Sequence, residues 1–133
     1  MSEDNLEIVR RSWDAWIHGD LAGMYAFWAT DAVWDLSNFA DAPEEVFQGV
    51  EAIDRFFQDW LGIWDDYEVG VDDFLVAPDG RIVVLYWHRG RGHRSGLEME
   101  LHNAQISTVS DGKITRMEIW DDPSEALAAV GLN

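Results

Sequence analysis

The sequence lacks cysteine entirely and is poor in basic residues. With no Cys in 133 residues, disulfide bonds and thiolate chemistry are excluded, and we expect a cytoplasmic protein. Only 9 Lys and Arg stand against 26 Asp and Glu, which gives a formal net charge of -17. Because this excess negative charge repels phosphate backbones and anionic lipid surfaces, we expect neither a nucleic-acid partner nor a membrane partner.

Long apolar runs are also missing. Residues 1–20 carry charged side chains throughout, with no apolar block of the length that a signal peptide or a membrane span needs. The chain contains no repeat, no low-complexity segment and no linker. Since its length is that of one average domain, we predict a single domain over residues 1–133.

Aromatic residues, in contrast, are abundant. Eight residues are Trp, which is more than a domain of this size needs to fill its core. Because Trp combines a large apolar surface with one N–H donor, it suits the wall of a ligand site. The alternative, that all eight pack in the core or at a subunit interface, stays open at this point.

Helical spacing of apolar residues dominates the first half of the chain. Asp4 and Glu7 form a capping-box pattern before a helix that Gly19 ends, and Asp20 can cap a second helix through residues 21–28. A short strand over residues 32–36 and a loop containing Pro43 follow. The third helix begins at Val50, and its wide apolar stripe must be covered by a large element. That stripe consists of Ile53, Phe56, Phe57, Trp60 and Leu61.

The second half alternates with the period of two that is typical of strands. One strand follows Trp64, and three longer strands are predicted over residues 82–89, 97–109 and 113–121. Their links contain Gly, as hairpin turns do, so these strands should pair antiparallel. Asp122 and Pro123 then predict the start of a closing helix. The order indicates an α+β fold: a cone-shaped, curved antiparallel sheet wrapped by three N-terminal helices, with a short C-terminal helix.

Five stretches together resemble the SnoaL-like branch of the nuclear-transport-factor-2-like superfamily. They are residues 7–11, 18–21, 30–34, 49–57 and 111–114. The resemblance implies a cone-shaped pocket and a homodimer packed through the outer face of the sheet. The superfamily includes ketosteroid isomerases, polyketide cyclases, limonene epoxide hydrolases and members with no known chemistry. A resemblance in fold therefore does not give an activity.

The catalytic set of ketosteroid isomerases is not reproduced. Those enzymes have a Tyr on the first helix, an Asp base after the first strand and a buried Asp on a late strand. Alignment on the shared motifs places Ser12 and Leu36 at the first two positions, with Asp35 one residue away. The late Asp falls near Asn103 or Ala104.

The set of limonene epoxide hydrolases is incomplete as well. Their Asp on the last strand, which polyketide cyclases of this type also keep as an acid, corresponds to Ile119. The two other positions correspond to Tyr86 and His88. The resemblance therefore leaves the reaction undefined.

Strand alternation nevertheless predicts a pocket lining. If Tyr86 and His88 point inward, residues at the same parity on the following strands do so too. These strands and the aromatic helices supply the ligand-binding candidates: Trp13, Trp16, Trp28, Trp34, Phe56, Trp60, Leu101, Asn103, Gln105, Met117, Ile119 and Asp121. Such a lining is apolar with a few polar groups, as small-molecule sites usually are. We expect a small hydrophobic molecule as the partner.

Three residues are candidates for catalysis. His88 can transfer a proton near neutral pH while Tyr86 or Asn103 holds a substrate oxygen, or it can instead pair with Glu98 in a structural network. Asp35 follows Trp34, and apolar surroundings would raise its pKa and make it a base, or it can simply cap the next loop. The four His show no metal-ligand spacing and no cofactor motif is present, so we expect neither a metal nor a cofactor.

Basic residues gather at one predicted hairpin, at Arg89, Arg91, His93 and Arg94. They can receive a substrate carboxylate, or they can pair with the surplus acids of the chain. The sequence thus favours a cofactor-independent isomerase, cyclase or hydrolase that works by acid/base chemistry. The alternative is a non-catalytic module for ligand binding or dimerisation.

Overall fold

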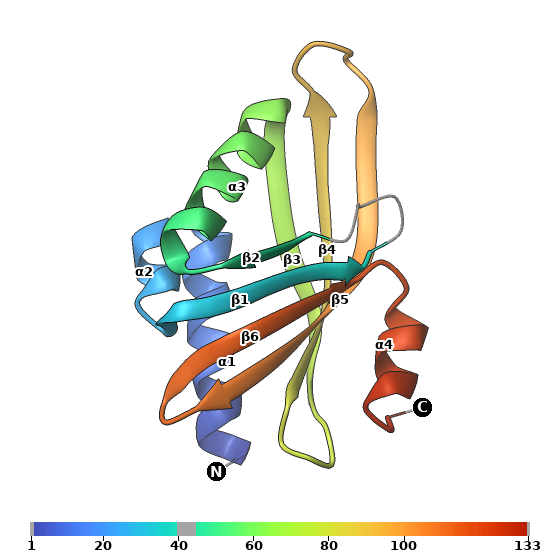
Figure 1. The fold of residues 1–133 in the computed structure, drawn as a ribbon. Helices are drawn as coiled ribbons and strands as arrows, with labels where there is room; N and C mark the ends of the chain where they lie inside the picture. Colours follow the sequence, from blue (N-terminus) through green and yellow to red (C-terminus); the bar gives the residue numbers. More distant parts are fainter. Residues whose placement is uncertain (1, 40–44, 133) are drawn as a thin grey trace.

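The computed structural model describes residues 2–39 and 45–132 (Figure 1). The helices are α1 (Ser2–Ile17), α2 (Leu21–Tyr25), α3 (Val50–Ile63) and α4 (Pro123–Ala129). The strands are β1 (Trp28–Asn38), β2 (Val46–Gln48), β3 (Trp64–Val76), β4 (Ile82–Gly92), β5 (Glu98–Ser110) and β6 (Lys113–Trp120). The predicted α+β class is confirmed.

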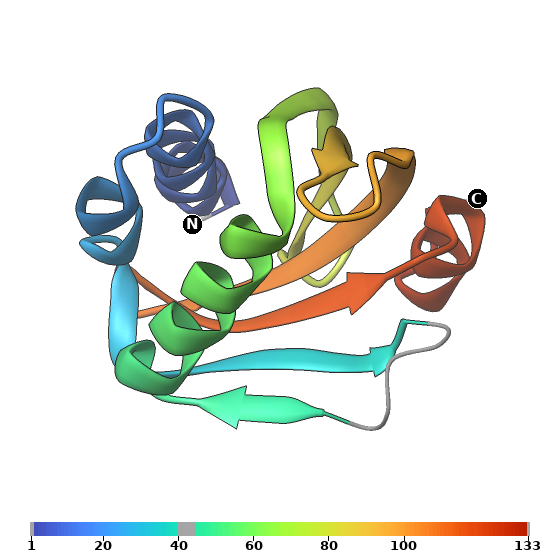
Figure 2. The same ribbon diagram turned by 90° about the horizontal axis from the view of Figure 1, so that it is seen from above.

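One curved sheet carries six strands in the order β2-β1-β6-β5-β4-β3. Figures 1 and 2 show α1, α2 and α3 gathered on one side of this sheet, while α4 lies on the other. The sheet is mixed rather than antiparallel throughout, because β1 runs parallel to β6. Hairpin rules correctly predicted the consecutive pairs, but β1 and β6 are distant in sequence and no turn residue announces their pairing.

The two N-terminal helices differ in detail from the prediction. The first begins at Ser2, before the predicted cap at Asp4, and Gly19 follows its end with a φ of 78°. The predicted cap Asp20 is confirmed, since its carboxylate accepts from the Gly23 N–H at 2.9 Å. The second helix nevertheless ends at Tyr25, because the next residues pair with β6: the Phe27 carbonyl accepts from the Ile114 N–H at 2.8 Å.

The middle of the chain follows the predicted pattern with one addition. The predicted strand over residues 32–36 is the centre of the longer β1, and the third helix begins at Val50 as expected. Short strand β2 was not predicted, because three residues are too few to show a period. The predicted loop at Pro43 lies outside the described residues.

The hairpin between β5 and β6 turns at Asp111 and Gly112, whose φ angles are 51° and 77°. Positive φ at both central residues is the feature of type I′ turns, and Asp-Gly is a preferred sequence for them. The closing helix also begins as predicted: Asp122 accepts from the Ser124 N–H at 2.9 Å, and Pro123 opens the helix. These local signals agree with the fold around them.

Strand alternation divides the apolar residues between the two faces of the sheet. On the helix side, Ile82, Val84 and Tyr86 of β4 join a large core with α1 and α3. On the other side, Val83 and Ile106 pack under α4 in a smaller core. No helix in the described parts of the chain is long and apolar enough to cross a membrane.

Candidate ligand-binding site

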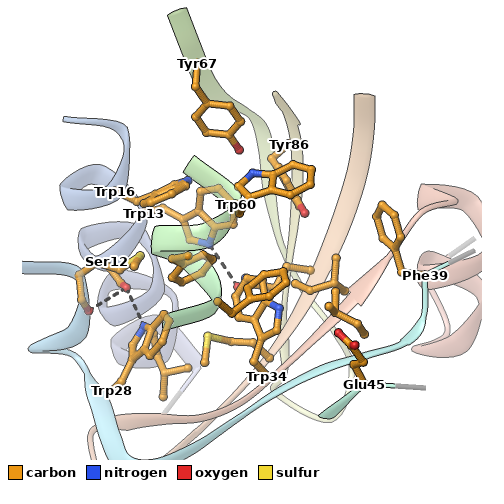
Figure 3. A pocket seen from close by; sticks show the side chains of 18 residues that line it. Ser12, Trp13, Trp16, Trp28, Trp34, Phe39, Glu45, Trp60, Tyr67 and Tyr86 are labelled. Carbon is orange, nitrogen blue, oxygen red and sulfur yellow. Dashed lines mark hydrogen bonds between the residues drawn. The ribbon is translucent and has the colours of Figure 1, made fainter. Parts of the chain in front are cut away.

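A cavity of about 340 Å³ lies between the helices and the inner face of the sheet (Figure 3). Eighteen described side chains line it, and ten of these are aromatic. The aromatic ten are Trp13, Trp16, Trp28, Trp34, Phe39, Phe56, Phe57, Trp60, Tyr67 and Tyr86. The remaining lining residues are Ser12, Met24, Leu36, Glu45, Gln105, Ile114, Met117 and Ile119. A volume in the range of small-molecule pockets and an apolar wall make this the candidate site.

The walls are held in place by contacts between aromatic rings. Phe57 of α3 stacks on Trp16 of α1 with 5.2 Å between ring centroids. The same Phe57 meets the Trp34 ring of β1 edge-on at 4.9 Å. Each contact joins a helix to another element, so the cavity has defined walls rather than loosely packed ones.

Several polar groups of the lining already have partners. The Trp28 indole donates to the Ser12 hydroxyl at 3.2 Å, and this hydroxyl donates in turn to the Met24 carbonyl at 3.2 Å. Across the cavity, the Trp13 indole donates to the Gln105 side-chain oxygen at 3.3 Å. These bonds tie α1 to α2, β1 and β5, and they fix the orientation of two of the indoles.

Two donors of the lining have no such partner. The Tyr86 hydroxyl makes no hydrogen bond within the described ranges, and Figure 3 shows it on the cavity side of the ring. The indole N–H of Trp34 is buried and likewise has no partner among the described residues. Burial, together with the nearby Tyr67 hydroxyl, raises the pKa of Tyr86, so Tyr86 stays a donor. An unpaired buried donor such as the Trp34 indole is uncommon in folded proteins, and a ligand oxygen would satisfy it.

His88 lies one hydrogen bond behind the cavity wall rather than in it. Its Nε2 is 2.8 Å from the Asn103 side-chain oxygen, and its Nδ1 is 2.9 Å from the Tyr67 hydroxyl. The Asn103 amide nitrogen donates to the Asp121 carbonyl at 3.3 Å, so its oxygen faces His88 and Nε2 must donate. Nδ1 is then an acceptor, and the Tyr67 hydroxyl donates to it.

The pKa values of this pair support the same assignment. Burial lowers the pKa of His88 from 6.5, although the hydrogen bond to Asn103 opposes the effect. Burial raises the pKa of Tyr67 to about 12, and the Trp60 indole opposes only part of this. The pair is therefore a neutral imidazole and a neutral phenol at neutral pH. The predicted pairing of His88 with Glu98 does not form, because Glu98 lies opposite Arg91.

Asp35 points to the outer face of the sheet. Its neighbours Trp34 and Leu36 line the cavity, and Asp35 between them pairs with Arg116 and accepts from the Ser37 hydroxyl at 2.6 Å. Burial would raise the pKa of Asp35, but the Ser37 hydrogen bonds and the Arg116 charge together lower it. The expectation of a raised pKa in apolar surroundings is therefore wrong, and Asp35 is an ionised carboxylate outside the cavity.

The remaining predicted ligand-binding residues divide into two groups. The lining includes Trp13, Trp16, Trp28, Trp34, Phe56, Trp60, Gln105, Met117 and Ile119. Leu101, Asn103 and Asp121 do not line the cavity. Leu101 lies opposite His88, beyond the last lining residue of β4, and Asp121 follows the end of β6. The alternation was read correctly, but it does not say where along a strand the cavity stops.

Three lining residues with polar groups were missed, namely Ser12, Tyr67 and Glu45. Tyr67 alternates with Val69 and Val71 on β3, and this pattern could have indicated an inward side chain. Glu45 lies between β1 and β2 and follows no period that could have revealed it. Three of the four basic residues of the β4–β5 hairpin, namely Arg89, Arg91 and His93, pair instead with acids of β3, as Arg89 does with Glu68 at 3.1 Å. Exposed pairs of this kind contribute little free energy.

Comparison with known proteins gives the family. The model of the SnoaL-like domain matches residues 9–117. An uncharacterized protein of Mycobacterium tuberculosis is 32% identical over 127 residues, which cover 93% of this chain and 95% of the relative. Among solved structures, an NTF2-like protein from Burkholderia thailandensis superposes with a TM-score of 0.80 at 25% identity, covering 94% of this chain and 95% of the other.

A second solved structure was determined with a ligand. It is the Mycobacterium tuberculosis protein RV0760c in complex with estradiol-17beta-hemisuccinate, with a TM-score of 0.72 at 18% identity. The match covers 91% of this chain and 95% of that one, and it supports the fold alone. From the matched domain, the relative and the shared architecture, this chain belongs to the SnoaL-like family, within the nuclear-transport-factor-2-like superfamily.

Proposed function

We propose that the protein binds a small, mainly apolar molecule that carries one hydrogen-bond acceptor. The observation that carries this proposal is the aromatic cavity of about 340 Å³ with two donors that have no partner among residues 2–39 and 45–132, the Tyr86 hydroxyl and the Trp34 indole. Apolar walls supply most of the binding free energy, and the donors orient the ligand. The ligand bound by RV0760c joins an apolar steroid ring system to a hemisuccinate that carries a carboxylate, so only its apolar ring system with oxygen acceptors agrees with this chemistry.

Titration of the purified protein with apolar molecules tests the proposal. We suggest para-tert-butylphenol, a terpene epoxide and a ketosteroid, followed through tryptophan fluorescence because five of the eight Trp line the cavity. At least one should bind saturably with one site per chain. Native mass spectrometry of the same sample would reveal a ligand carried over from expression. If none of the three binds, the proposed function is wrong.

Tyr86→Phe sharpens this experiment because it removes one unpaired donor and keeps the ring. Affinity for a bound molecule with an oxygen acceptor should fall about fivefold, the effect of one neutral hydrogen bond. The matched control is Tyr25→Phe, since the Tyr25 hydroxyl donates to Asp54 at 2.8 Å and Tyr25 is not part of the lining. If the two variants lowered the ligand affinity equally, the Tyr86 hydroxyl would not be the donor that binds the ligand.

Proton transfer through Tyr67 and His88 is a second candidate function. It is favoured by the hydrogen bond of 2.9 Å that joins the cavity wall to the imidazole. In one step, a bound ketone gives an α-proton to the Tyr67 oxygen while the Tyr67 proton moves to Nδ1 of His88. The electron pair stays on the ligand as an enolate, whose oxygen accepts from Tyr86. If the ketone has a β,γ double bond, the electron pair is also shared with the γ-carbon, and return of the proton there gives the conjugated isomer and restores both residues.

Exchange of ketone α-hydrogens in deuterated water measures this step without knowledge of the natural substrate. An apolar ketone that binds should exchange faster with the protein than without it. Tyr67→Phe and His88→Gln should each slow the catalysed exchange about 100-fold while the ketone still binds. If both variants exchange the ketone hydrogens at the wild-type rate, proton transfer through Tyr67 and His88 is contradicted. The proposal of a non-catalytic binding protein would then remain.

A further inference from the structure

We propose that the ligand of this cavity carries a positive charge, as a small organic ammonium ion held among the aromatic rings with Glu45 at the cavity mouth. This inference rests on the proposed function and adds the charge of the ligand to it. The observations that carry it are the charges in the lining, the placement of the basic side chains and the number of ring faces.

The part of the lining that the structure describes has one carboxylate and no basic group. Among the eighteen described lining residues, none is Lys, Arg or His, and Glu45 is the single acid. Figure 3 shows the Glu45 carboxylate turned toward the cavity. Its position is fixed by the backbone, because the Glu45 carbonyl accepts from the Leu36 N–H at 2.9 Å and Leu36 also lines the cavity. An anionic ligand would meet no counter-charge here.

The basic side chains near the site are engaged elsewhere. Arg116 pairs with Asp35 on the outer face, and the Lys113 ammonium donates to the Ala26 carbonyl at 2.8 Å. Arg91 pairs with Asp66 in the exposed hairpin. His88 adds no charge, since its imidazole is neutral behind Tyr67. None of these groups can neutralise a ligand carboxylate inside the cavity.

Aromatic rings are the complementary surface for an organic cation. The face of an indole or phenol ring carries negative electrostatic potential, and the attraction strengthens where water is excluded. Trp16, Trp34, Trp60 and Tyr67 bring such rings from four different elements. The formal charge of -17 adds a long-range field that attracts cations and repels anions. The lining and the field of the whole chain thus favour the same sign of ligand charge.

Three ligands of one shape separate charge from size. Para-hydroxyphenyltrimethylammonium, para-tert-butylphenol and para-hydroxybenzenesulfonate share a phenol ring and carry a cationic, a neutral and an anionic head. They are titrated into the full chain slightly below neutral pH, where the phenol stays protonated. We expect the cation to bind about tenfold more tightly than the neutral molecule, as cation–π attraction in a desolvated site predicts, and the sulfonate to bind most weakly.

Glu45→Gln removes the carboxylate, and Glu98→Gln makes the same charge change at the start of β5, away from the lining. The first variant should weaken the cation about threefold without affecting the neutral molecule, because Glu45 is exposed and water screens its charge. The second should change neither affinity. A cation preference that Glu45→Gln leaves intact would overturn the role of Glu45.

The neutral ligand keeps this inference separate from the proposed function. If para-tert-butylphenol binds as tightly as the ammonium ion or more tightly, the charge assignment is overturned and the apolar cavity stands. If neither binds, and the terpene epoxide and the ketosteroid fail as well, the proposed function falls and the inference falls with it. Added salt should weaken binding of the cation and leave the neutral ligand unchanged, which would support the assignment.

Discussion

The two faces of the sheet use the same residue type in different ways. On the inner face, five Trp line the cavity. On the outer face, the Trp87 ring lies 5.2 Å from the Arg89 guanidinium, and Trp120 packs beside α4. The abundance of Trp therefore has two causes. Inner rings form a ligand wall, whereas outer rings contact an exposed guanidinium or pack in the small core under α4.

The same contrast holds for His88 and Asp35, two buried ionisable residues of the sheet. His88 and Asp35 are 6% and 5% exposed, and the pKa of each is lowered. The consequences are opposite, because His88 stays neutral and Asp35 stays charged. Inward-facing His88 has neutral partners, whereas outward-facing Asp35 has the half-exposed Arg116. Side-chain direction, more than burial, decides which residue belongs to the site.

The largest expected effect comes from the inner network. Asn103→Leu removes the acceptor of the buried His88 N–H and should lower the free energy of unfolding by about 2–3 kcal/mol, the cost of an unpaired buried donor. Urea denaturation measures it. The control is Gln58→Leu, an exposed amide on α3, which should stay within about 0.5 kcal/mol of wild type. Similar losses in both variants would contradict the network.

A pH series separates the two ionisable residues. Because the pKa of folded His88 lies below 6.5, the unfolded chain binds more protons than the folded one just below that pH. Stability is therefore full above pH 6.5 and is lost as the pH falls, by at most about 1.4 kcal/mol per pH unit. His88→Gln should flatten this part of the curve. An unchanged slope in the variant would mean that His88 is charged in the folded protein.

Asp35→Asn tests the outer network with a smaller effect. The amide keeps the Ser37 hydrogen bond but loses the charge facing Arg116, whose side chain is 42% exposed. Because water screens this pair, we expect a loss of about 1 kcal/mol at neutral pH. The loss should shrink below pH 3.8, since a lowered pKa contributes stability above that value and loses it as the carboxylate protonates. A constant difference at all pH values would argue against the ion pair.

The smallest effect is expected in the exposed hairpin. Arg89→Gln breaks the pair with Glu68 and the contact with the Trp87 ring, both at a solvent-accessible side chain. Unfolding free energy should change by about 0.5 kcal/mol, and ligand affinity should not change. A loss above about 2 kcal/mol would mean that the outer ion pairs hold the sheet together.

Local chemistry explains what could be predicted from the sequence. Asp20, Asp122 and the Asp111-Gly112 turn act on their immediate neighbours, so the chain signals them directly. The parallel pairing of β1 with β6 has no local signal, since residues about eighty positions apart meet there. Helix α2 ends at Tyr25 rather than at the predicted residue 28 because of the same distant pairing. The residues after Tyr25 have helical spacing, but they pair with β6 instead of continuing the helix.

The candidate site, like the fold, was predictable where local periodicity decides the position of a side chain and not where distant pairing does. Most lining aromatics follow from helical and strand periods. The position of His88 behind Tyr67 depends on the register of β3 against β4, which puts Val69 opposite His88. Asp35 was misplaced because its neighbour Trp34 suggested apolar surroundings, although adjacent strand residues face opposite sides.

The central claim is that the aromatic cavity receives a ligand, and indole N–H signals in a nitrogen-15 correlation spectrum test it directly. Addition of para-tert-butylphenol should shift the signals of Trp13, Trp16, Trp28, Trp34 and Trp60, which line the cavity. The signals of Trp87 and Trp120, on the outer face, should stay in place. Shifts confined to Trp87 and Trp120 would contradict the account and place the ligand outside the cavity.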